Sequence, residues 1–157
     1  MEIDRNGLEV PSRQECLRLL AAESLGRLAI HSGALPTIIP VNFALTDGGI
    51  VIRTSAGSKL DAAVTNSVVA FEVDSYDGVY HSGWSVVVVG VAREITDPDE
   101  LDEVRRLHLP HWAPGPADHY VSISTELISG RLLRNPRHAP FDHGAAVRPA
   151  LDGGVPA

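Results

Sequence analysis

The sequence has a single cysteine, Cys16, and no hydrophobic run that approaches the roughly 18 residues a membrane-spanning helix requires. One cysteine cannot form an internal disulfide, so the 157-residue chain must rely on a hydrophobic core, which a chain of this length can build. The N-terminal stretch MEIDRNGLEVPSR is polar and lacks the hydrophobic segment of a secretory signal. These absences predict a cytoplasmic protein without membrane spans.

Positive charge is scarce as well. The chain has 13 lysines and arginines against 20 aspartates and glutamates, a formal net charge of -7. Proteins that bind nucleic acids or anionic membranes usually carry a basic surface, so neither is expected as a partner. Lys59 is the only lysine among the basic residues. A general bias toward arginine does not explain why this one position is lysine.

The signatures of common catalytic and metal sites are also missing. The sequence contains no Gly-x-Ser-x-Gly nucleophile motif. His108 and His111 have a helical spacing, but Pro110 lies between them and no acidic or cysteine partner can be identified for a metal. His31 is expected to be a partly buried structural histidine. The sequence therefore nominates no catalytic side chain and no metal ion.

Hydrophobic periodicity divides the chain into helices and strands. Helices are expected at residues 12–24, 57–66 and 97–107, and strands at 27–32, 37–46, 50–55, 67–74, 84–95, 119–125 and 127–134. Residues 1–11 are expected to form an arm, and residues 75–83 and 108–118 to form loops. The pattern predicts one domain over residues 12–134, followed by a weakly ordered tail at 135–157 that lacks periodicity.

Local signals support this division. Ser12 and Glu15 have the spacing of a capping box, and Gly26 suits the end of the first helix. Asp47-Gly48-Gly49 predicts a hairpin, and Pro40 predicts a bulge or break in its strand. Because strands outnumber helices and do not alternate with them, we expect a mainly β protein, an antiparallel barrel with flanking helices.

The segment 84–95 is the strongest strand signal. Its residues from Val86 to Val91 are apolar on both faces of the strand. The interior of one barrel can cover only one of these faces, so the other needs a different cover. This pattern predicts a homodimer with the strand near its interface.

Residues 53–59, with the sequence RTSAGSK, form a candidate phosphate site. Hydroxyl groups, free amides at a helix N-terminus and two cations, Arg53 and Lys59, can together hold a phosphate. The spacing is not that of a Walker A loop. The alternative is a polar turn whose serine caps the next helix. Trp84 leaves a similar choice open, since it could form the wall of a pocket for a planar ring or be a core tryptophan.

The order of these motifs resembles one known family. The segments that carry the resemblance are LGRLAIHSGALPTIIPVNFAL, IVIRTSAGSKLDAA, VVAFEVD, GWSVVVVGVAREIT and ISGRLL. Together they are similar to the pyridoxamine 5′-phosphate oxidase-like family of flavin-binding split barrels, and most similar to a small actinobacterial-type branch related to nitroimidazole-resistance proteins. The resemblance covers about residues 12–134.

The resemblance implies an antiparallel six-stranded split β-barrel, a homodimer, and flavin mononucleotide (FMN) in a cleft between the subunits. The cofactor-binding residues that it implies are Pro40, Val41 and Asn42 along the isoalloxazine ring, Arg53, Thr54, Ser55, Ser58 and Lys59 around the phosphate, and Trp84 and Ser85 from the partner subunit. The family's basic C-terminal motif is reduced here to Arg131 and Arg134, which argues against oxidation of vitamin B6.

The implied function is that of a flavin-dependent oxidoreductase that passes hydride or electrons to a small planar or nitroaromatic acceptor. In such a protein the flavin does the redox chemistry and the chain supplies position and electrostatics. A deazaflavin cofactor or haem is the alternative ligand. A non-catalytic carrier or sensor of the same fold, or a plain dimeric interaction domain, is the alternative function.

Overall fold

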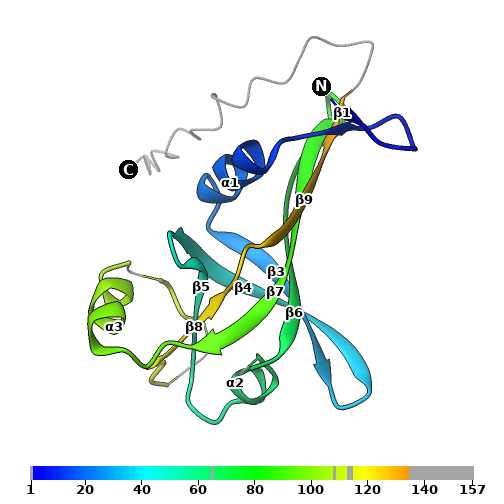
Figure 1. Cartoon of the computed structure of the whole chain (residues 1–157). Coiled ribbons are helices and arrows are strands. Elements are labelled where there is room, and N and C mark those ends of the chain that lie inside the picture. Colours follow the sequence, from blue (N-terminus) through cyan, green and yellow to red (C-terminus); the bar gives the residue numbers. More distant parts are fainter. Residues whose placement is uncertain (1, 65, 108, 113–114, 135–157) are drawn as a thin grey trace, which may run out of the picture.

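The computed structural model describes residues 2–64, 66–107, 109–112 and 115–134 (Figure 1), with only the backbone described at Ser32, Lys59, Ala62 and Ala63. The tail predicted at 135–157 lies outside the described residues. The elements in chain order are β1 (Glu2–Ile3), β2 (Glu9–Val10), α1 (Arg13–Ala21), β3 (Leu25–Ser32), β4 (Leu35–Thr46), β5 (Gly49–Thr54), α2 (Lys59–Val64), β6 (Val68–Asp77), β7 (Ser82–Glu94), α3 (Pro98–Arg105), β8 (His119–Ile123) and β9 (Leu127–Leu133). None of the helices within the described ranges is long and apolar enough to cross a membrane.

Six antiparallel strands close into a barrel. The pairing runs from β7 through β6, β3, β4, β5 and β8, and β8 then returns to β7. The remaining strands extend the sheet beyond the barrel, because β9 pairs with β7, β2 with β9, and β1 with β2. The predicted fold class, a six-stranded antiparallel split barrel with flanking helices, is therefore confirmed.

The long strand β7 pairs with two different strands along one edge. Residues 83–89 pair with β9, whereas residues 92–94 pair with β8. The chain crosses from β8 to β9 directly over Gly90, where a Cβ atom would lie 2.1 Å from the carbonyl oxygen of Ser124. Glycine is therefore required at this crossing, since any side chain would push the two strands apart.

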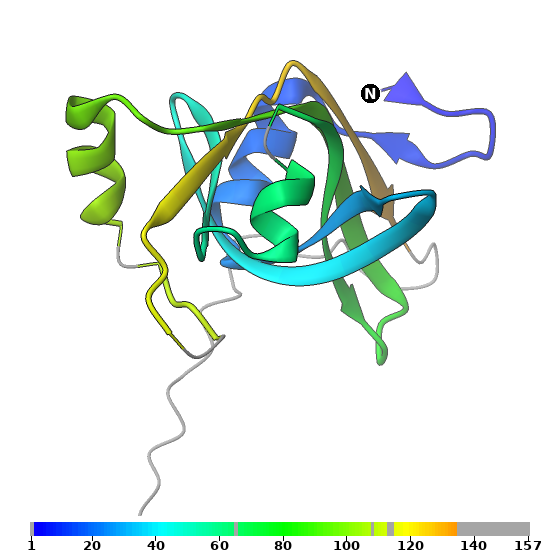
Figure 2. The same ribbon diagram turned by 90° about the horizontal axis from the view of Figure 1, so that it is seen from below.

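The barrel interior holds the main hydrophobic core. Inward-pointing residues alternate along the strands, and the largest of those with almost no exposed surface are Leu28, Phe43, Ile50, Ile52, Phe71, Val73, Val86, Val88 and Ile123. Phe43 and Phe71 meet edge to face, with ring centroids 4.9 Å apart. Helix α1 adds Leu19 and Leu20 to this core and α2 adds Val64. Figures 1 and 2 place these two helices at opposite ends of the barrel.

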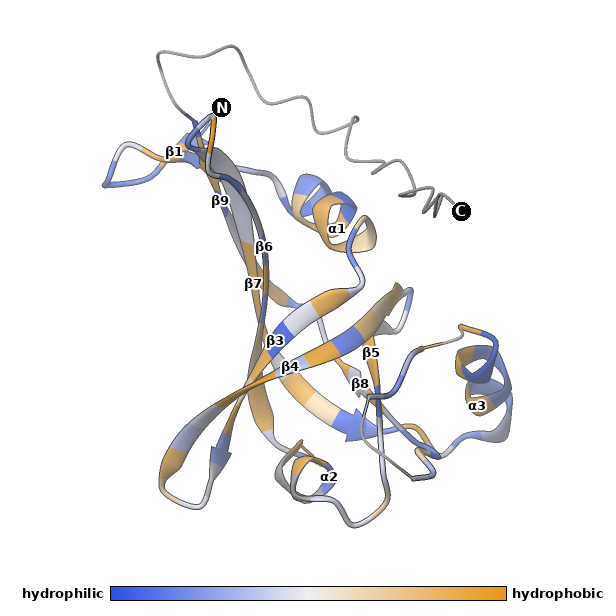
Figure 3. Cartoon of the chain, turned by 180° about the vertical axis from the view of Figure 1, so that it is seen from behind, coloured by the Kyte–Doolittle hydropathy of each residue, from blue (hydrophilic) through white to orange (hydrophobic). Residues whose placement is uncertain are grey.

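Helix α3 packs outside the barrel on β5 and β8. Val104 of α3 joins Val51, Ile95, Leu109 and Tyr120 in a second, smaller hydrophobic cluster. The helix is mostly hydrophilic, in contrast to the largely hydrophobic barrel strands (Figure 3). It therefore docks through one apolar stripe.

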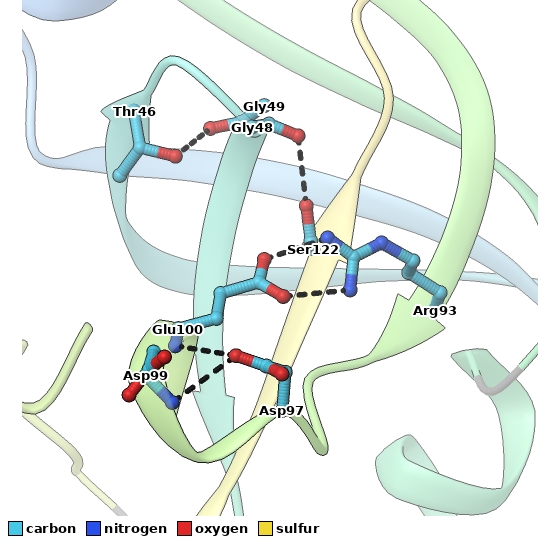
Figure 4. A network of polar contacts seen from close by, with 8 residues as sticks. All are labelled: Thr46, Gly48, Gly49, Arg93, Asp97, Asp99, Glu100 and Ser122. Carbon is cyan, nitrogen blue, oxygen red and sulfur yellow. Dashed lines mark hydrogen bonds and ion pairs between the residues drawn. The ribbon is translucent and has the colours of Figure 1, made fainter. Parts of the chain in front are cut away.

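A polar network surrounds the start of α3 (Figure 4). Asp97 caps the helix by accepting from the amides of Asp99 and Glu100. Glu100 forms a two-pronged ion pair with Arg93 of β7, with N–O distances of 2.6 and 3.1 Å. Ser122 of β8 donates to the carbonyl of Gly48 in the β4–β5 turn. These contacts tie the helix start and the hairpin turn to adjacent strands.

The predicted start of the first helix is confirmed and its predicted end is wrong. Ser12 accepts from the amide of Glu15, as the capping box requires, while the Glu15 carboxylate pairs with Arg18. The helix ends at Ala21 with Ala22 as its C-cap, so Gly26 is not the stop. Gly26 lies in β3 instead, where a Cβ would come 2.2 Å from the Phe71 ring. The glycine is needed for that close approach.

The predicted bulge or break at Pro40 is wrong. The register between β3 and β4 is continuous from Leu25 opposite Asn42 to Ser32 opposite Leu35, with Pro40 opposite Arg27. In this half of β4 the second edge is free of strand partners, because β5 pairs only with residues 43–46. A missing N–H that points to a free edge removes no ladder hydrogen bond, so proline is tolerated.

The loop predicted at 75–83 is wrong in extent. Strand β6 continues to Asp77 and β7 begins at Ser82, so the turn is limited to residues 78–81. Asp77 stabilises the turn by accepting from the amides of Val79 and Tyr80. Pairing between the two strands overrides the polar, glycine-containing sequence. Similarly, the expected N-terminal arm contains the small β1–β2 hairpin.

Candidate functional site

The ring-lining residues implied for β4 lie on two faces of the barrel wall. Pro40 and Asn42 point outward and Val41 points into the core. The register places Pro40 in one row with Arg27, Glu72 and Val87 across β3, β6 and β7. Side chains of one row share a face, so Pro40 and Asn42 belong to the outward face of this sheet, which we call the outer face.

A hollow of about 150 Å³ lies beside residues 39–42 of β4. Its lining residues are Ile39, Pro40, Val41, Asn42, Arg53, Leu60, Pro110, His111 and Trp112. We call it the β4 hollow. The structure thus brings together four residues that the sequence nominated, Pro40, Val41, Asn42 and Arg53, in a mainly apolar concavity.

Hydrogen bonds from the barrel hold the loop that contributes Pro110, His111 and Trp112 to the β4 hollow. The amide nitrogen Nδ2 of Asn42 donates to the carbonyl of Pro110 at 3.2 Å. Arg53 donates through Nη1 to the carbonyl of Leu109 at 3.4 Å and through Nε to that of Ala117. Its guanidinium carbon also lies 5.8 Å from the centroid of the Tyr120 ring. Arg53 therefore fastens the loop to β5, whatever else it binds.

The turn between β5 and α2 is held by its own side chains. The hydroxyls of Thr54 and Ser58 lie 3.0 Å apart, and Ser58 Oγ accepts from the amide of Asp61 at 3.0 Å. Asp61 in turn accepts from the amide of Gly57, which has a φ of +68°. The structure therefore shows Ser58 as a helix cap, which was the alternative interpretation of this segment.

The phosphate-binding interpretation of this turn stays a prediction. Lys59 begins α2, but its side chain lies outside the described part of the structure. Ser55 is half-buried, and its carbonyl accepts from the amide of Ser58 at 3.1 Å. The Thr54 hydroxyl belongs to a buried side chain. A phosphate at this turn would therefore depend mainly on Lys59 and on Ser55.

Trp84 and Ser85 do not line the β4 hollow in this chain. Trp84 is 4% exposed and belongs to the main core, in register with Leu132 of β9. Ser85 is on the outer face, between Asp74 of β6 and Arg131 of β9. Two strands, β6 and β3, separate it from β4. Within one chain, these two residues and the β4 residues are thus apart.

Sequence reasoning missed the loop residues Pro110, His111 and Trp112, which line the β4 hollow. The signal that could have identified them is a tryptophan in a proline-rich irregular segment, HLPHWAPGPAD, where no core position is expected. His111 was considered only for metal binding, and no potential metal-binding cluster is found among the described residues. The expectation for His31 is wrong, because this side chain is exposed. It lies on the outward side of β3, opposite Pro36 at the far end of β4.

Charged side chains cross the middle of the outer face. Arg27 lies 2.7 Å from Asp74 and 3.6 Å from Glu72, measured between guanidinium nitrogen and carboxylate oxygen. Burial, together with the neighbouring Asp74 charge, raises the pKa of Glu72, and Arg27 opposes this shift. Exposed apolar residues surround this cluster on the face: Ile38, Val68, Val89, Val91 and Leu127.

The two arginines at the end of β9, Arg131 and Arg134, are paired within the chain. Arg131 lies 2.8 Å from Asp4, and Arg134 lies 2.6 Å from Glu9. Both carboxylates belong to the β1–β2 hairpin and its turn. Neither arginine is therefore a free cation for a ligand phosphate.

Comparison with known proteins establishes the class of this split barrel. The family model for pyridoxamine 5′-phosphate oxidase matches residues 12–132, so the chain belongs to that family. The uncharacterised protein Rv0080 of Mycobacterium tuberculosis is 40% identical over 131 residues, covering 80% of this chain and 86% of that protein.

The solved structures that are similar to the chain include two FAD-binding proteins. A FAD-binding protein from Mycobacterium smegmatis is 36% identical with a TM-score of 0.71, covering 80% of this chain and all of that one. A FAD-binding protein from Mesorhizobium loti is 25% identical with a TM-score of 0.65, covering 82% of this chain and 98% of that one. Both resemblances span nearly the whole of the solved chains.

Proposed function

We propose that the protein is a flavin-dependent oxidoreductase that binds FMN in the β4 hollow. The observation that carries the proposal is the meeting of Pro40, Val41, Asn42 and Arg53 at one concavity in a chain of this family. The two solved relatives named for FAD binding support a flavin as the ligand. We propose FMN rather than FAD because the family that the sequence resembles implies FMN.

The residues present fit the ring of a flavin. Apolar surface from Ile39, Pro40 and Leu60 can receive a planar aromatic system, and Asn42 and Arg53 add polar groups at its edge. When bound, the flavin would supply the redox chemistry. The chain would hold the ring, exclude water from one of its faces, and present the other face to a small planar or nitroaromatic acceptor.

Binding of the FMN phosphate would depend mainly on Lys59. The hydroxyls of Thr54 and Ser58 already contact each other, and the Asp61 carboxylate beside them would repel an anion. A cation at position 59 would offset that repulsion and add a charge-assisted hydrogen bond. This is our reason to keep Lys59 as the principal phosphate ligand.

The pairing of Arg131 with Asp4 and of Arg134 with Glu9 disfavours oxidation of a vitamin B6 phosphate. Each guanidinium would have to leave a carboxylate before it could bind a substrate phosphate. A neutral or weakly charged planar acceptor makes no such demand. We therefore propose an acceptor without a phosphate group.

We also propose a homodimer that covers the outer face. Val68, Val89, Val91 and Leu127 are exposed there, although large apolar side chains of this kind are normally buried. Ser85 lies on the same face, so a second copy of the chain could bring its own Ser85 toward the first copy's β4 hollow. This arrangement would account for the separation of Ser85 from Pro40 within one chain. The location that we propose is the cytoplasm, and a free, buried Cys16 is compatible with it.

A non-catalytic flavin carrier is the second candidate. The observation in its favour is that the structures from Mycobacterium smegmatis and Mesorhizobium loti are named for FAD binding and not for a reaction, although a third solved structure, from Corynebacterium glutamicum, is named after pyridoxamine 5′-phosphate oxidase. In addition, Arg53 and His111 are the only ionisable side chains among the described residues that line the β4 hollow. A carrier would hold the cofactor without reducing an acceptor.

Absorbance spectroscopy followed by anaerobic stopped-flow measurements tests the proposal. Freshly purified protein, or protein reconstituted with FMN, should show flavin bands. A reduced nicotinamide or a reduced deazaflavin should bleach them, and oxygen or a nitroaromatic compound should restore them. Bands that bleach with dithionite but with no biological donor would favour the carrier. A Soret band would indicate haem, and absence of flavin binding would refute the proposal.

A further inference from the structure

Trp112 differs from the other tryptophan of the chain in its surroundings. Trp84 lies in the core at 4% exposure, whereas 63% of Trp112 is exposed at the rim of the β4 hollow. An isolated exposed tryptophan is uncommon but needs no special explanation. Trp112 is informative because it lines the same hollow as the β4 residues.

The backbone that carries Trp112 is fixed on the side that precedes it. Leu109 is buried in the second hydrophobic cluster with Val104 of α3. The carbonyls of Leu109 and Pro110 accept hydrogen bonds from Arg53 and Asn42. Trp112 follows two residues later, so its backbone position is set before any ligand arrives. A preorganised aromatic side chain loses little conformational entropy when it binds.

The β4 hollow is lined by the barrel and by a loop. Ile39 and Pro40 of β4 and Leu60 of α2 form the barrel side, and Pro110 and Trp112 form the loop side. A planar aromatic ring that binds along β4 would stack one face on the indole and remove exposed apolar surface from water, and its other face would remain open to the acceptor. No polar group of Trp112 is needed for this contact, since the indole offers its flat face.

We propose that Trp112 is the aromatic wall of the ring site and stacks on the planar ring that binds along Pro40–Asn42. The inference rests on the proposed function, because the ring is that of the flavin. It adds a residue that neither the sequence motifs nor the family resemblance nominated. In this proposal Trp112 contacts only the flavin ring, whereas Lys59 contacts only the phosphate.

Two variants test this inference. Trp112→Ala removes the aromatic wall, and Trp112→Phe keeps a smaller one. Affinities are measured for FMN and for riboflavin, which has the same ring but no phosphate. Trp112→Ala should weaken both ligands by the same factor, roughly 5- to 150-fold, as loss of an aromatic stacking partner does. Trp112→Phe should recover most of that loss.

A spectroscopic measurement separates direct stacking from a structural effect. An indole in contact with a flavin quenches the flavin's emission, so bound flavin should be dim in the wild type and brighter in Trp112→Ala. The melting temperature of the apo-protein should change by no more than about 3 °C, because the side chain is largely exposed.

The outcomes are distinguishable. Equal flavin affinities for wild type and Trp112→Ala, with unchanged flavin emission, would overturn the inference and leave the proposed function in place. A loss for FMN without a loss for riboflavin would also overturn it, since the contact would then be with the phosphate end. If the wild-type protein binds neither flavin, the proposed function fails, and the inference fails with it.

Discussion

At the scale of single residues, the turn after β5 shows how polar groups serve the chain itself. Ser58 accepts from the amide of Asp61, and Asp61 accepts from the amide of Gly57. Asp61 also lies 3.2 Å from Nδ1 of His119 on β8. These contacts connect α2 to the end of the barrel. A ligand at this turn must therefore bind beside a network that is already complete.

Lys59 is the residue whose function can be tested most cleanly. Lys59→Ala should reduce FMN affinity by roughly 10- to 150-fold, because a charge-assisted hydrogen bond is worth about 1.5–3 kcal/mol. Riboflavin affinity should hardly change, since riboflavin has no phosphate. Isothermal titration with both ligands measures the difference. A similar loss for the two ligands would mean that the substitution damages the fold.

At the scale of elements, the β1–β2 hairpin depends on Asp4. The amides of Leu8 and Asn6, together with Arg131, hold the pKa of Asp4 below its usual value of 3.8, against an opposing effect of burial. The ionised carboxylate both shapes the turn and binds the hairpin to β9.

This shift predicts a specific dependence of stability on pH. Because the pKa of Asp4 is lowered in the folded state, its contribution is present above about pH 3.8 and is lost as the pH falls through the folded value. Asp4→Asn should therefore melt at a lower temperature than the wild type at pH 7, with the difference shrinking toward pH 3. Melting curves from pH 3 to 7 measure this. A difference that grows on acidification would contradict the assignment.

Helix α3 is a second element whose attachment can be analysed. Its ion pair between Arg93 and Glu100 is short, but the Arg93 side chain is half exposed. Hydrogen bonding to Glu100 raises the pKa of Arg93, which is charged at any ordinary pH in either case. Val104, by contrast, is buried in the second cluster. Apolar burial should therefore dominate the docking of the helix.

The comparison of two alanine variants tests that ranking. Val104→Ala should lower the free energy of unfolding by about 1–3 kcal/mol, through lost burial and a residual cavity. Arg93→Ala should cost less than about 1 kcal/mol, as exposed ion pairs do. Chemical denaturation measures both values. A larger loss for Arg93→Ala would show that the polar network of Figure 4 governs the docking.

At the scale of the whole molecule, the outer face carries large apolar side chains that one chain leaves exposed. The predicted second apolar face of β7 is real, because Val89 and Val91 are 37% and 53% exposed. Ala70 and Leu127 flank Val89 on the neighbouring strands. The Arg27, Glu72 and Asp74 cluster adjoins this apolar row and would be shielded from water in a dimer.

A charge placed in the apolar row tests the homodimer. Light scattering at micromolar concentration should give a dimer mass for the wild type and a lower mass for Val89→Glu, because an unpaired carboxylate would be buried at the interface. Thr96→Glu is the matched control, since Thr96 is exposed on the connection between β7 and α3. A monomeric wild-type protein would contradict the prediction.

The local elements could largely be predicted from the sequence, because they depend on neighbouring residues. The cap at Ser12, the acidic start of α3 at Asp97 and the hairpin turn at Asp47-Gly48 follow from side chains a few positions apart. The short apolar-rich segments of β3, β5 and β7 likewise indicated strands. The local patterns gave wrong predictions at Gly26 and Pro40. Gly26 lies in β3 because of its close approach to Phe71 of β6, and β4 continues through Pro40 because it stays paired with β3.

Only the tertiary structure decided which polar residues serve a site and which serve the fold. The sequence by itself determined the fold class and nominated Pro40, Asn42 and Arg53, because strand pattern and motif order are properties of the chain. That Arg53 binds loop carbonyls, and that Arg131 binds Asp4, depends on residues between 56 and 127 positions apart. Trp112 could not be predicted for the same reason. Its place at the β4 hollow depends on hydrogen bonds that Asn42 of β4 and Arg53 of β5 donate to its loop. Such contacts arise only when the barrel closes, since closure alone brings these segments within hydrogen-bonding distance.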